Sequence, residues 1–489
     1  MDSMSERILD AIILGAGFGG LGAAAQLKRN NIDNFLILEK KDHIGGVWRD
    51  NTYPGAACDT QSVIYCYSYF LNLRVSRMYA DGSELLGYLE SLADEFDVRG
   101  NIRFESLVSS ATWQEERHVW RVETADHQVF YAKVFIPAWG QLSEPSTPTF
   151  TDAHLFRGVS FHSAEWDHDV DLTGLRVGSI GSAASAVQYV PEVAKVAQHL
   201  SVFQRSANYI LPRNQIVFSE EELDRFQRHP ESFERIRGEI HGQREAGFTR
   251  TKHLSADQNE GALEARAHLE AQVSDPQLRR SLTPTFEFGC KRILRSDAYY
   301  PALSQANVSL ETSSVDRFTE SGIVTGDGVH HELDVIIYGT GFKSQAFQGD
   351  LVVTGRDGVT LDQRWGDSPE AYLGMAVDGF PNMFMVYGPN TNLNHNSIVT
   401  MLEAQHEYIV QVITHLRDDE DHVFDVRLNV LREFNDMVQQ ELEGSAYSSD
   451  CSSWYKNAAG KVINNWCGTV DEYRTMTNEF DLADYAAVK

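Results

Sequence analysis

The stretch AIILGAGFGG, residues 11–20, joins a short apolar run to a glycine-rich turn and decides the fold of the first part of the chain. The apolar run has the composition of a buried strand, and the glycines follow it in the pattern Gly15-x-Gly17-x-x-Gly20. A helix-forming stretch, LGAAAQLKRN, and a second apolar run come next. Strand, glycine turn, helix and strand in this order are typical of a Rossmann unit, which binds a dinucleotide.

The glycines and the residue that ends the unit indicate how such a ligand would be held. Glycines allow a tight turn and a close approach to a pyrophosphate, whose charge lies at the helix N-terminus. Glu39 ends the second apolar run, 24 residues after Gly15. An acid there accepts hydrogen bonds from free ribose hydroxyls. The first unit therefore predicts an FAD site that includes Gly15, Gly17, Gly20 and Glu39.

A second copy of the unit begins at Leu175 with LRVGSIGSAASAVQYV. Its fingerprint is Gly181-x-Ala183-x-x-Ala186, and Arg205 ends the following apolar run, again 24 residues after the first glycine. An arginine at that place suits a 2′-phosphate, so this unit predicts an NADPH site. Ala183 stands where glycine usually lets the backbone approach the pyrophosphate. Either a small shift of the phosphate accommodates the methyl group, or NADPH binding is weakened, or the unit is structural and has lost its ligand.

Composition and charge restrict the class of protein. The chain has 489 residues with 42 Lys and Arg against 70 Asp and Glu, which gives a formal charge of −28. We expect no nucleic-acid partner, because phosphate backbones are bound by clustered Lys and Arg. No run approaches the ~18 apolar residues that span a bilayer. The opening segment MDSMSERILD carries acids where a signal peptide carries bases. We therefore expect a cytoplasmic protein with no membrane partner; its oligomeric state stays open.

The five cysteines and seventeen histidines form no recognisable metal or disulfide pattern. There is no C-x-x-C pair and no H-E-x-x-H arrangement, so we predict no metal site. Cys58 and Cys66 are the closest pair, eight residues apart, and a redox disulfide between them is an alternative. We interpret all five cysteines as free, buried or half-buried thiols.

The chain is expected to form two nucleotide-binding domains, each made of separate pieces. Residues 100–136 alternate apolar and polar positions and predict antiparallel strands. Residues 216–284 are charged and rich in helix formers, so we interpret them as a helical insertion in the second domain, or as a mobile lid. Residues 378–397 predict an apolar strand and a polar loop that leads into a helix. The predicted pieces are 1–147 and 343–489 for FAD, 148–215 and 285–342 for NADPH, and 216–284 for the insertion.

Two long motifs carry a family resemblance. FRGVSFHSAEWD, residues 156–167, matches the pattern F-x-G-x-x-x-H-x-x-x-W-[PD], the signature of Baeyer–Villiger monooxygenases. The second motif, GGVWRDNTYPGAACD, residues 45–59, matches the other long motif of that family without exception. The chain resembles this family from about residue 8 to about residue 480. The signature residues here are Phe156, Gly158, His162, Trp166 and Asp167.

The resemblance implies a fold, a reaction and a catalytic centre. It implies an α/β protein with two Rossmann-like domains, which binds FAD and NADPH and uses molecular oxygen to convert a ketone to an ester or lactone. In the family, reduced flavin and oxygen form a C4a-peroxyflavin, and its attack on the ketone gives a tetrahedral intermediate. Arg292 resembles the active-site arginine that stabilises this negative charge, and Asp59 resembles the carboxylate that positions it. From the residues alone, Arg292 could be a surface ion-pair partner and Asp59 a turn residue.

The resemblance also implies which residues contact the cofactors. On the flavin side these are Gly46, Trp48, Asp59 and Tyr65. His162 and Trp166 are expected at the domain junction, where they would organise movement of the nicotinamide, although a purely structural histidine is an alternative. The NADPH side is expected to include the second fingerprint, the 2′-phosphate contacts and one tryptophan, namely Gly181, Ser182, Ala183, Ala184, Ser185, Ala186, Arg205, Ser206, Lys291 and Trp454.

Two other functions remain open on the sequence. One is a flavin monooxygenase that oxidises sulfur or nitrogen, although such enzymes usually carry Tyr or Phe in place of Trp166. The other is a flavin-binding protein without turnover, for which Ala183 is the only argument. The sequence does not indicate which ketone is used.

Overall fold

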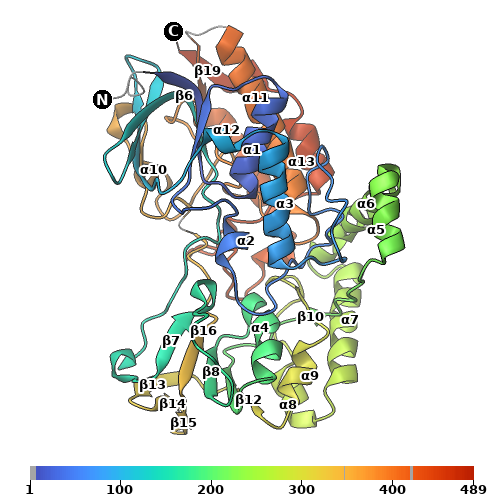
Figure 1. Cartoon of the computed structure of the whole chain (residues 1–489). Coiled ribbons are helices and arrows are strands. Elements are labelled where there is room, and N and C mark those ends of the chain that lie inside the picture. Colours follow the sequence, from blue (N-terminus) through green and yellow to red (C-terminus); the bar gives the residue numbers. More distant parts are fainter. Residues whose placement is uncertain (1–6, 346, 419–421, 489) are drawn as a thin grey trace.

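The computed structural model describes residues 7–345, 347–418 and 422–488 and has two halves, each built on its own sheet (Figure 1). The first sheet has the strand order β17-β4-β5-β6-β1-β2-β3. Strands β1, β2, β3 and β6 are parallel, and β4 and β5 continue the sheet as an antiparallel meander beside β6. The strands are β1 (Ile8–Leu14), β2 (Phe35–Leu38), β3 (Ile102–Arg103), β4 (Val108–Gln114), β5 (Val119–Thr124), β6 (Val129–Pro137) and β17 (Val352–Thr354).

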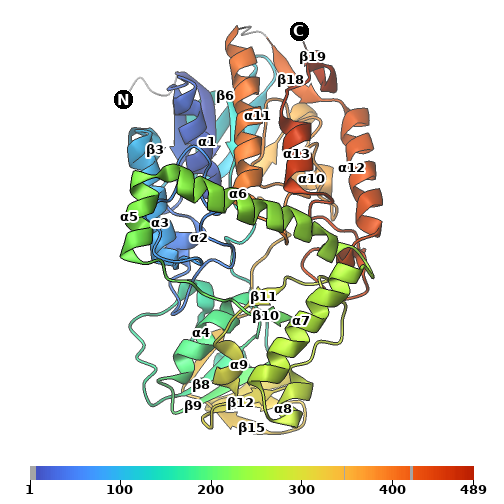
Figure 2. The ribbon, with the colours of Figure 1, turned by 90° about the vertical axis from the view of Figure 1, so that its right-hand side faces the viewer.

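Helix α1 (Phe18–Arg29) connects β1 to β2 and gives the strand, turn, helix and strand that the glycine pattern predicts. Its alanine run, residues 23–25, is fully or almost fully buried. These small residues let α1 pack closely against helix α11 (Ile398–Asp418), which lies beside it in Figure 2. The helices α2 (Val47–Asp50) and α3 (Gly82–Glu95) complete this side of the first half.

The second sheet is wholly parallel, in the order β12-β9-β8-β16-β7. Helix α4 (Ala184–Ala194) connects β8 to β9, so the second copy of the unit is confirmed. The strands are almost continuous in apolar residues, as expected for a parallel sheet that is buried on both faces. The elements of this half are β7 (Val159–His162), β8 (Arg176–Ile180), β9 (His199–Phe203), β10 (Ile210–Leu211), β11 (Leu294–Arg295), α9 (Tyr299–Leu303), β12 (Val308–Glu311), β13 (Val315–Thr319), β14 (Gly322–Thr325), β15 (His330–Glu332) and β16 (Val335–Tyr338).

The insertion at 216–284 is helical, as predicted, and it interrupts the second unit in the sequence. It consists of α5 (Glu220–Arg228), α6 (Pro230–Ala246), α7 (Ala256–Gln272) and α8 (Pro276–Ser281). In space it contacts both halves. Phe226 and Phe233 are buried in the core of the first half, whereas Leu269 and Val273 are buried in the core of the second. Figure 2 shows α6 crossing in front of the first half while α7 runs down along the second.

The C-terminal part returns to the first half. It contains α10 (Leu361–Trp365), α11, β18 (Val423–Val426), α12 (Leu428–Glu443), α13 (Val470–Thr477) and β19 (Tyr485–Val488). The predicted helix after residue 397 is confirmed, but the apolar strand predicted within 378–397 is wrong. Met383 makes one isolated bridge to Phe135, and the chain then follows β6 through single backbone bonds from Phe384 and Val386. Within the described residues, no helix combines the length and apolar composition needed to cross a bilayer.

Candidate active site

The first glycine turn has the shape that a pyrophosphate requires. Gly15 has φ +98°, and a Cβ atom on Gly20 would lie 1.8 Å from the carbonyl oxygen of Gly15, so neither position accepts another residue without rearrangement. Gly17 is the N-cap of α1 and offers no side chain to the first backbone N–H groups of the helix. Those N–H groups are therefore available to an anion, and the turn fits the pyrophosphate of a dinucleotide.

Glu39 lies where the first unit predicts it, at the end of β2 and beside the glycine turn. Its side chain is buried, and its two oxygens accept bonds from the backbone N–H groups of Ala16 at 2.8 Å and Lys41 at 2.9 Å. Arg49 contacts the same carboxylate at 3.1 Å. Gly46 faces the turn from the other side, since a Cβ there would lie 3.1 Å from the Cα of Gly17. Oε1 accepts both the Lys41 N–H and Arg49 Nη1, whereas Oε2 accepts only the Ala16 N–H and keeps a lone pair that a ribose hydroxyl can use.

The second glycine turn explains why alanine is tolerated at position 183. Gly181 has φ +117°, and its Cβ would lie 2.2 Å from the carbonyl oxygen of Gly339, so a glycine is required there. Ala183 has φ −93° and ψ −155°, almost the same conformation as Gly17 with φ −90° and ψ −164°. This is an extended conformation that alanine adopts without strain. Ser182 is buried and Ala186 is buried, whereas Ala183 and Ala184 are exposed and Ser185 is half-buried.

The predicted 2′-phosphate contacts lie together. Lys291 Nζ donates to Ser206 Oγ at 3.0 Å. Burial and the neighbouring charge of Arg205 both lower the pKa of Lys291, so the two cations are close. Arg205 itself is exposed at the end of β9. In a chain with a charge of −28, this pair of cations forms a local positive site for a phosphate.

Aromatic rings form one wall of the flavin side. Trp48 and Tyr65 meet edge to face, with ring centroids 5.8 Å apart, and Tyr65 meets Phe18 at 5.1 Å. Phe18 begins α1 directly after the glycine turn. The predicted Trp48 and Tyr65 thus lie beside the pyrophosphate turn, where an aromatic ring system can pack.

The two long motifs meet at helix α4. Tyr53 OH donates to Gln188 Oε1 at 2.8 Å, and the amide nitrogen of Gln188 donates to Ala57 O at 2.8 Å. Tyr189, the next residue, packs against Tyr53 at 6.1 Å and against Trp166 at 5.7 Å. Trp166 therefore lies at the junction of the two halves, as predicted.

The other signature residues shape the strand at the edge of the second sheet. Gly158 has no room for a side chain, because its Cβ would lie 2.3 Å from Asp334 O and 2.4 Å from the ring of Phe156. His162 ends β7, is buried, and accepts the Ala164 N–H at Nδ1, while burial lowers the pKa of its ring. Asp167 accepts the N–H of Asp169 at 3.0 Å and forms a turn. These contacts are structural, and they place His162 at the carboxyl edge of the second sheet.

Asp59 and Arg292 form a two-pronged ion pair between the halves. Arg292 Nε lies 2.9 Å from Asp59 Oδ2, and Nη2 lies 2.6 Å from Oδ1 and 2.7 Å from Oδ2. The charge of Asp59 outweighs burial and raises the pKa of Arg292. Burial opposes ionisation of Asp59, but the charge and hydrogen bonds of Arg292 lower its pKa. Both groups are therefore charged at neutral pH.

Two tyrosines stand close to this ion pair. The charge of Arg292 acts on Tyr387 and Tyr455, and burial raises the pKa of both, that of Tyr387 to about 12. Tyr387 OH donates to Asn392 at 2.7 Å, and Tyr455 OH donates to Asn394 at 2.7 Å. Tyr387 has φ +63°, an uncommon conformation for a bulky residue, and such conformations occur often at functional sites. Sequence reasoning missed both tyrosines, since nothing distinguishes them from core residues.

A disulfide next to the ion pair overturns part of the cysteine prediction. Cys290 and Cys451 are bonded, with Cα atoms 6.3 Å apart, while Cys58, Cys66 and Cys467 are free and buried. The prediction of five free thiols is therefore wrong for two of them. Their separation of 161 residues gives no local signal in the sequence.

The disulfide ties two predicted site segments together. Cys290 directly precedes Lys291 and Arg292, and Cys451 lies three residues before Trp454. Trp454 is half-buried and packs on Tyr455 at 4.7 Å. The disulfide thus holds the segment that contains Trp454 next to the segment that contains Lys291 and Arg292.

Comparisons with known proteins agree over the whole chain. Residues 12–216 match the pyridine nucleotide-disulphide oxidoreductase family. The chain is 38% identical over 486 residues to a Baeyer-Villiger monooxygenase of Pseudomonas aeruginosa, covering 98% of this chain and 92% of that protein. It is 38% identical to a Baeyer-Villiger monooxygenase of Streptomyces coelicolor, covering 100% and 94%.

Solved structures give the same result. The structure of an oxidized steroid monooxygenase bound to NADP superimposes with a TM-score of 0.87, at 29% identity and with 99% and 100% coverage of the two chains. The closed structure of a cyclohexanone monooxygenase gives a TM-score of 0.88, at 26% identity and with 99% coverage of each chain.

Proposed function

This chain belongs to the Baeyer–Villiger monooxygenases, and we propose that Arg292, held by Asp59, is the cation on which its reaction depends. The protein is an FAD-containing enzyme that uses NADPH and molecular oxygen to convert ketones to esters or lactones. We also propose that the ketone is a small molecule and that the enzyme acts in the cytoplasm.

The observation that carries the proposal is the free edge of the Arg292 guanidinium. Its bonds to Asp59 use Nε and Nη2 only. Nη1 makes no hydrogen bond within the part of the chain that the structure describes. A guanidinium that is fixed along one edge can offer its other N–H groups to an oxygen that gains negative charge.

The surroundings strengthen this interaction. Asp59 and Arg292 are only 26% and 33% exposed, and the buried Tyr455 and the half-buried Tyr387 lie near them. A partly dry site makes the attraction between a cation and a developing anion larger than it is in water. The charge of Asp59 raises the pKa of Arg292, so the guanidinium stays charged at neutral pH.

The cofactors fit the turns that the sequence predicts for them. FAD would be held by the first glycine turn with Glu39, Gly46 and the ring wall of Trp48 and Tyr65. NADPH would be held by the second glycine turn, by Lys291 with Arg205 and Ser206, and by Trp454. When both are bound, the flavin accepts a hydride from NADPH and activates oxygen. The remaining role of the protein is to exclude water, position the ketone and stabilise negative charge.

The test compares Arg292→Ala with Arg292→Lys in the holoenzyme. The alanine variant is expected to bleach its flavin with NADPH at a normal rate but to form ester about 10²–10³-fold more slowly. Arg292→Lys keeps the positive charge but loses the forked guanidinium, and its rate of ester formation should lie between those of the wild type and Arg292→Ala. Unchanged ester formation in Arg292→Ala would overturn the assignment. Loss of flavin bleaching would instead place Arg292 in the NADPH site. Oxidation of sulfur or nitrogen compounds with no ester from any ketone would favour the alternative class.

A further inference from the structure

Helix α6 belongs to the second unit in the sequence but packs on the first half. Phe233 is wholly buried there, and Ile236 and Ile240 pack against the same core as α1 and α11. Phe226 of α5 meets Phe233 edge to face at 5.3 Å. The helix is thus held along its length against the half that contains the flavin turn, as Figure 2 shows.

The polar residues of α6 that face this half lie on one side of the helix. Arg237, His241, Arg244 and Glu245 are spaced by four, seven and eight positions from the first, which places them on one face. Arg235 and Glu239 lie on the outer face and pair with each other in solvent, where they are 67% and 56% exposed. The inner face therefore carries the contacts that distinguish α6 from a solvated helix.

The two inner arginines hold opposite ends of one short loop. Arg237 Nη1 donates to Cys66 O at 2.9 Å and to Val63 O at 3.2 Å. Arg244 Nε donates to Gln61 Oε1 at 2.8 Å, and its Nη2 donates to the same oxygen. The contacts of the two arginines span residues 61–66, and we call residues 59–66, which begin at Asp59, the Asp59 loop.

The Asp59 loop carries two residues of the candidate active site. Asp59 begins it and Tyr65 lies near its end. The carbonyl oxygen of Gln61 accepts the backbone N–H groups of Ile64 at 3.0 Å and Tyr65 at 3.1 Å. Gln61 therefore has two roles: its side chain binds Arg244, and its carbonyl oxygen closes the turn before Tyr65.

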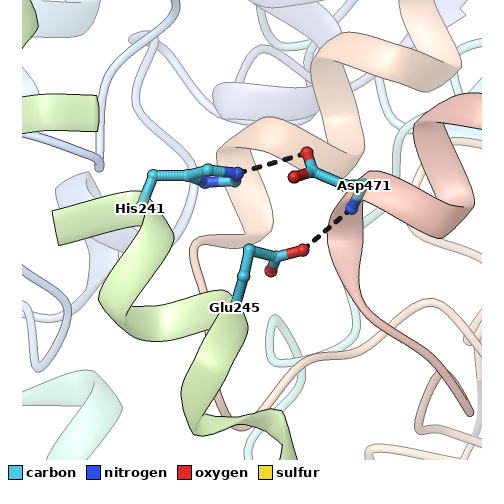
Figure 3. A group of neighbouring side chains, drawn as sticks. All are labelled: His241, Glu245 and Asp471. Atoms are coloured by element: carbon cyan, nitrogen blue, oxygen red, sulfur yellow. Dashed lines mark hydrogen bonds and ion pairs between the residues drawn. The ribbon is translucent and has the colours of Figure 1, made fainter. Parts of the chain in front are cut away.

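The C-terminal end of α6, which carries Arg244, is fastened to helix α13 and to the loop before α11. Glu245 accepts the backbone N–H groups of Val470 and Asp471 at 3.3 and 3.0 Å, and Asn396 Nδ2 at 2.6 Å. His241 pairs with Asp471 at 3.2 Å, as Figure 3 shows. One atom from each of His241, Glu245 and Asp471 lies within 4.8 Å of the others, as in a metal site. Because N–H donors already occupy both Glu245 oxygens, we interpret the group as the anchor of the helix.

The charge of Arg244 has no carboxylate partner within the described part of the chain. Burial and the neighbouring Arg295 lower the pKa of Arg244 to about 10, and the positive charge of Arg244 contributes to lowering the pKa of Asp59. A partly buried cation without an ion pair is costly, and side chains of this kind are often retained for function.

We propose that Arg237 and Arg244 are positioning residues through which α6 clamps the Asp59 loop and keeps Asp59 aimed at Arg292. The inference rests on the proposed function of Arg292. The helical insertion is then the element that holds the carboxylate in register with a cation from the other half. A mobile lid would not make backbone contacts of this kind in the resting protein.

The test measures order in the Asp59 loop directly, by hydrogen exchange with mass spectrometry on the holoenzyme. In Arg244→Ala the amides of a peptide that spans 59–66 should exchange about tenfold faster than in wild type, because a charge-assisted hydrogen bond is lost. Arg237→Ala should show the same change. Arg235→Ala, from the outer face of α6, is the matched control and should leave this peptide unchanged. Equal exchange in Arg244→Ala and Arg235→Ala would overturn the clamp.

A second measurement, the amount of ester formed for each NADPH consumed, links the clamp to catalysis. Arg244→Ala is expected to consume NADPH at a normal rate but to release hydrogen peroxide in place of about half or more of the ester, because Arg292 is less well fixed. Arg244→Lys should restore part of the ester yield. Faster loop exchange with an unchanged ester yield would overturn the positioning role. If Arg244→Ala does not fold, Gln61→Ala removes the acceptor and carries the same expectations. If the wild type makes no ester from any ketone, the proposed function fails, while the exchange result still decides the clamp.

Discussion

Asp59 and Arg292 lie 233 positions apart in the sequence and meet in a two-pronged ion pair whose shortest contact is 2.6 Å. Asp59 ends a motif of the first half, and Arg292 lies two residues after the disulfide cysteine Cys290. The ion pair depends on how the two halves are placed, so neither half contains the proposed catalytic centre alone. Gln188 of helix α4 joins the halves near this ion pair, because it bonds to Tyr53 and to Ala57 O.

Removal of the carboxylate should affect ester formation more than flavin reduction. Asp59→Ala leaves Arg292 charged but no longer fixed, and we expect ester formation to fall about 10²-fold while flavin bleaching by NADPH stays within about threefold. Glu320→Ala, which breaks an exposed ion pair with Arg157 far from the site, is the control. An Asp59→Ala enzyme with a wild-type ester yield would contradict the role of the ion pair.

The disulfide between Cys290 and Cys451 leads to two expectations, one for the number of free thiols and one for the melting temperature. Denatured, non-reduced protein should titrate three thiols, and reduced protein should titrate all five. Cys451→Ser should lower the melting temperature by several degrees, because a cross-link that closes a long loop contributes about 2–4 kcal/mol. The same comparison in the presence of a reductant should show little difference. Five free thiols in the non-reduced protein would exclude the bond.

Ala183 is predicted to be harmless to NADPH binding. Its backbone conformation matches that of Gly17, and its methyl group is exposed. Ala183→Gly should therefore change the affinity for NADPH by less than about threefold, which is about 0.7 kcal/mol. Gly20→Ala is the contrasting variant and should lose FAD, because the added Cβ would meet the carbonyl of Gly15. A large gain in NADPH affinity in Ala183→Gly would show that the methyl group does weaken the site.

Part of the stability of the folded protein should depend on the ionisation of Glu245 and should be lost in acid. Burial opposes its ionisation, but bonds from His395, the Asp471 N–H and Asn396 lower its pKa from 4.5 to about 2. Because the folded pKa lies below the ordinary value, the stabilisation is complete above pH 4.5 and is lost as the pH falls from 4.5 toward 2.

Thermal melting across this range tests that sign. Glu245→Gln should be less stable than wild type at pH 7, by up to about 3 kcal/mol, and the gap should narrow below pH 4.5. Glu239→Gln, on the outer face of α6, should show no such gap. A gap that widens on acidification would contradict the low pKa of Glu245.

The nucleotide-binding units could be predicted because their signal is local. The pattern from Gly15 to Glu39 and its copy from Gly181 to Arg205 each encode a turn. The first position of each turn requires glycine, whereas the position of Gly17 and Ala183 has an extended conformation that alanine also adopts. The apolar run near Met383 has the composition of a strand, but composition does not show how many backbone bonds the run will form with a neighbouring strand. Its pairing is limited to one bridge and single backbone bonds.

Contacts between segments far apart in the sequence were the ones missed. Arg244 lies in a helix rich in charged residues, and nothing in that composition separates it from the solvated Arg235. Cys290 and Cys451 were separated by too many residues to pair by pattern. Asp59 and Arg292 were predicted from a family resemblance, whereas the residues that hold them required the structure.

The most direct test of the central claim follows oxygen into the product. The wild-type enzyme is incubated with NADPH, a ketone panel and heavy-isotope oxygen gas, and the products are examined by mass spectrometry. We predict an ester or lactone that contains one heavy oxygen atom, formed about 10²–10³-fold more slowly in Arg292→Ala although its flavin is still reduced. Consumption of NADPH and oxygen that yields only hydrogen peroxide for every ketone, or an unlabelled ester, would contradict this prediction.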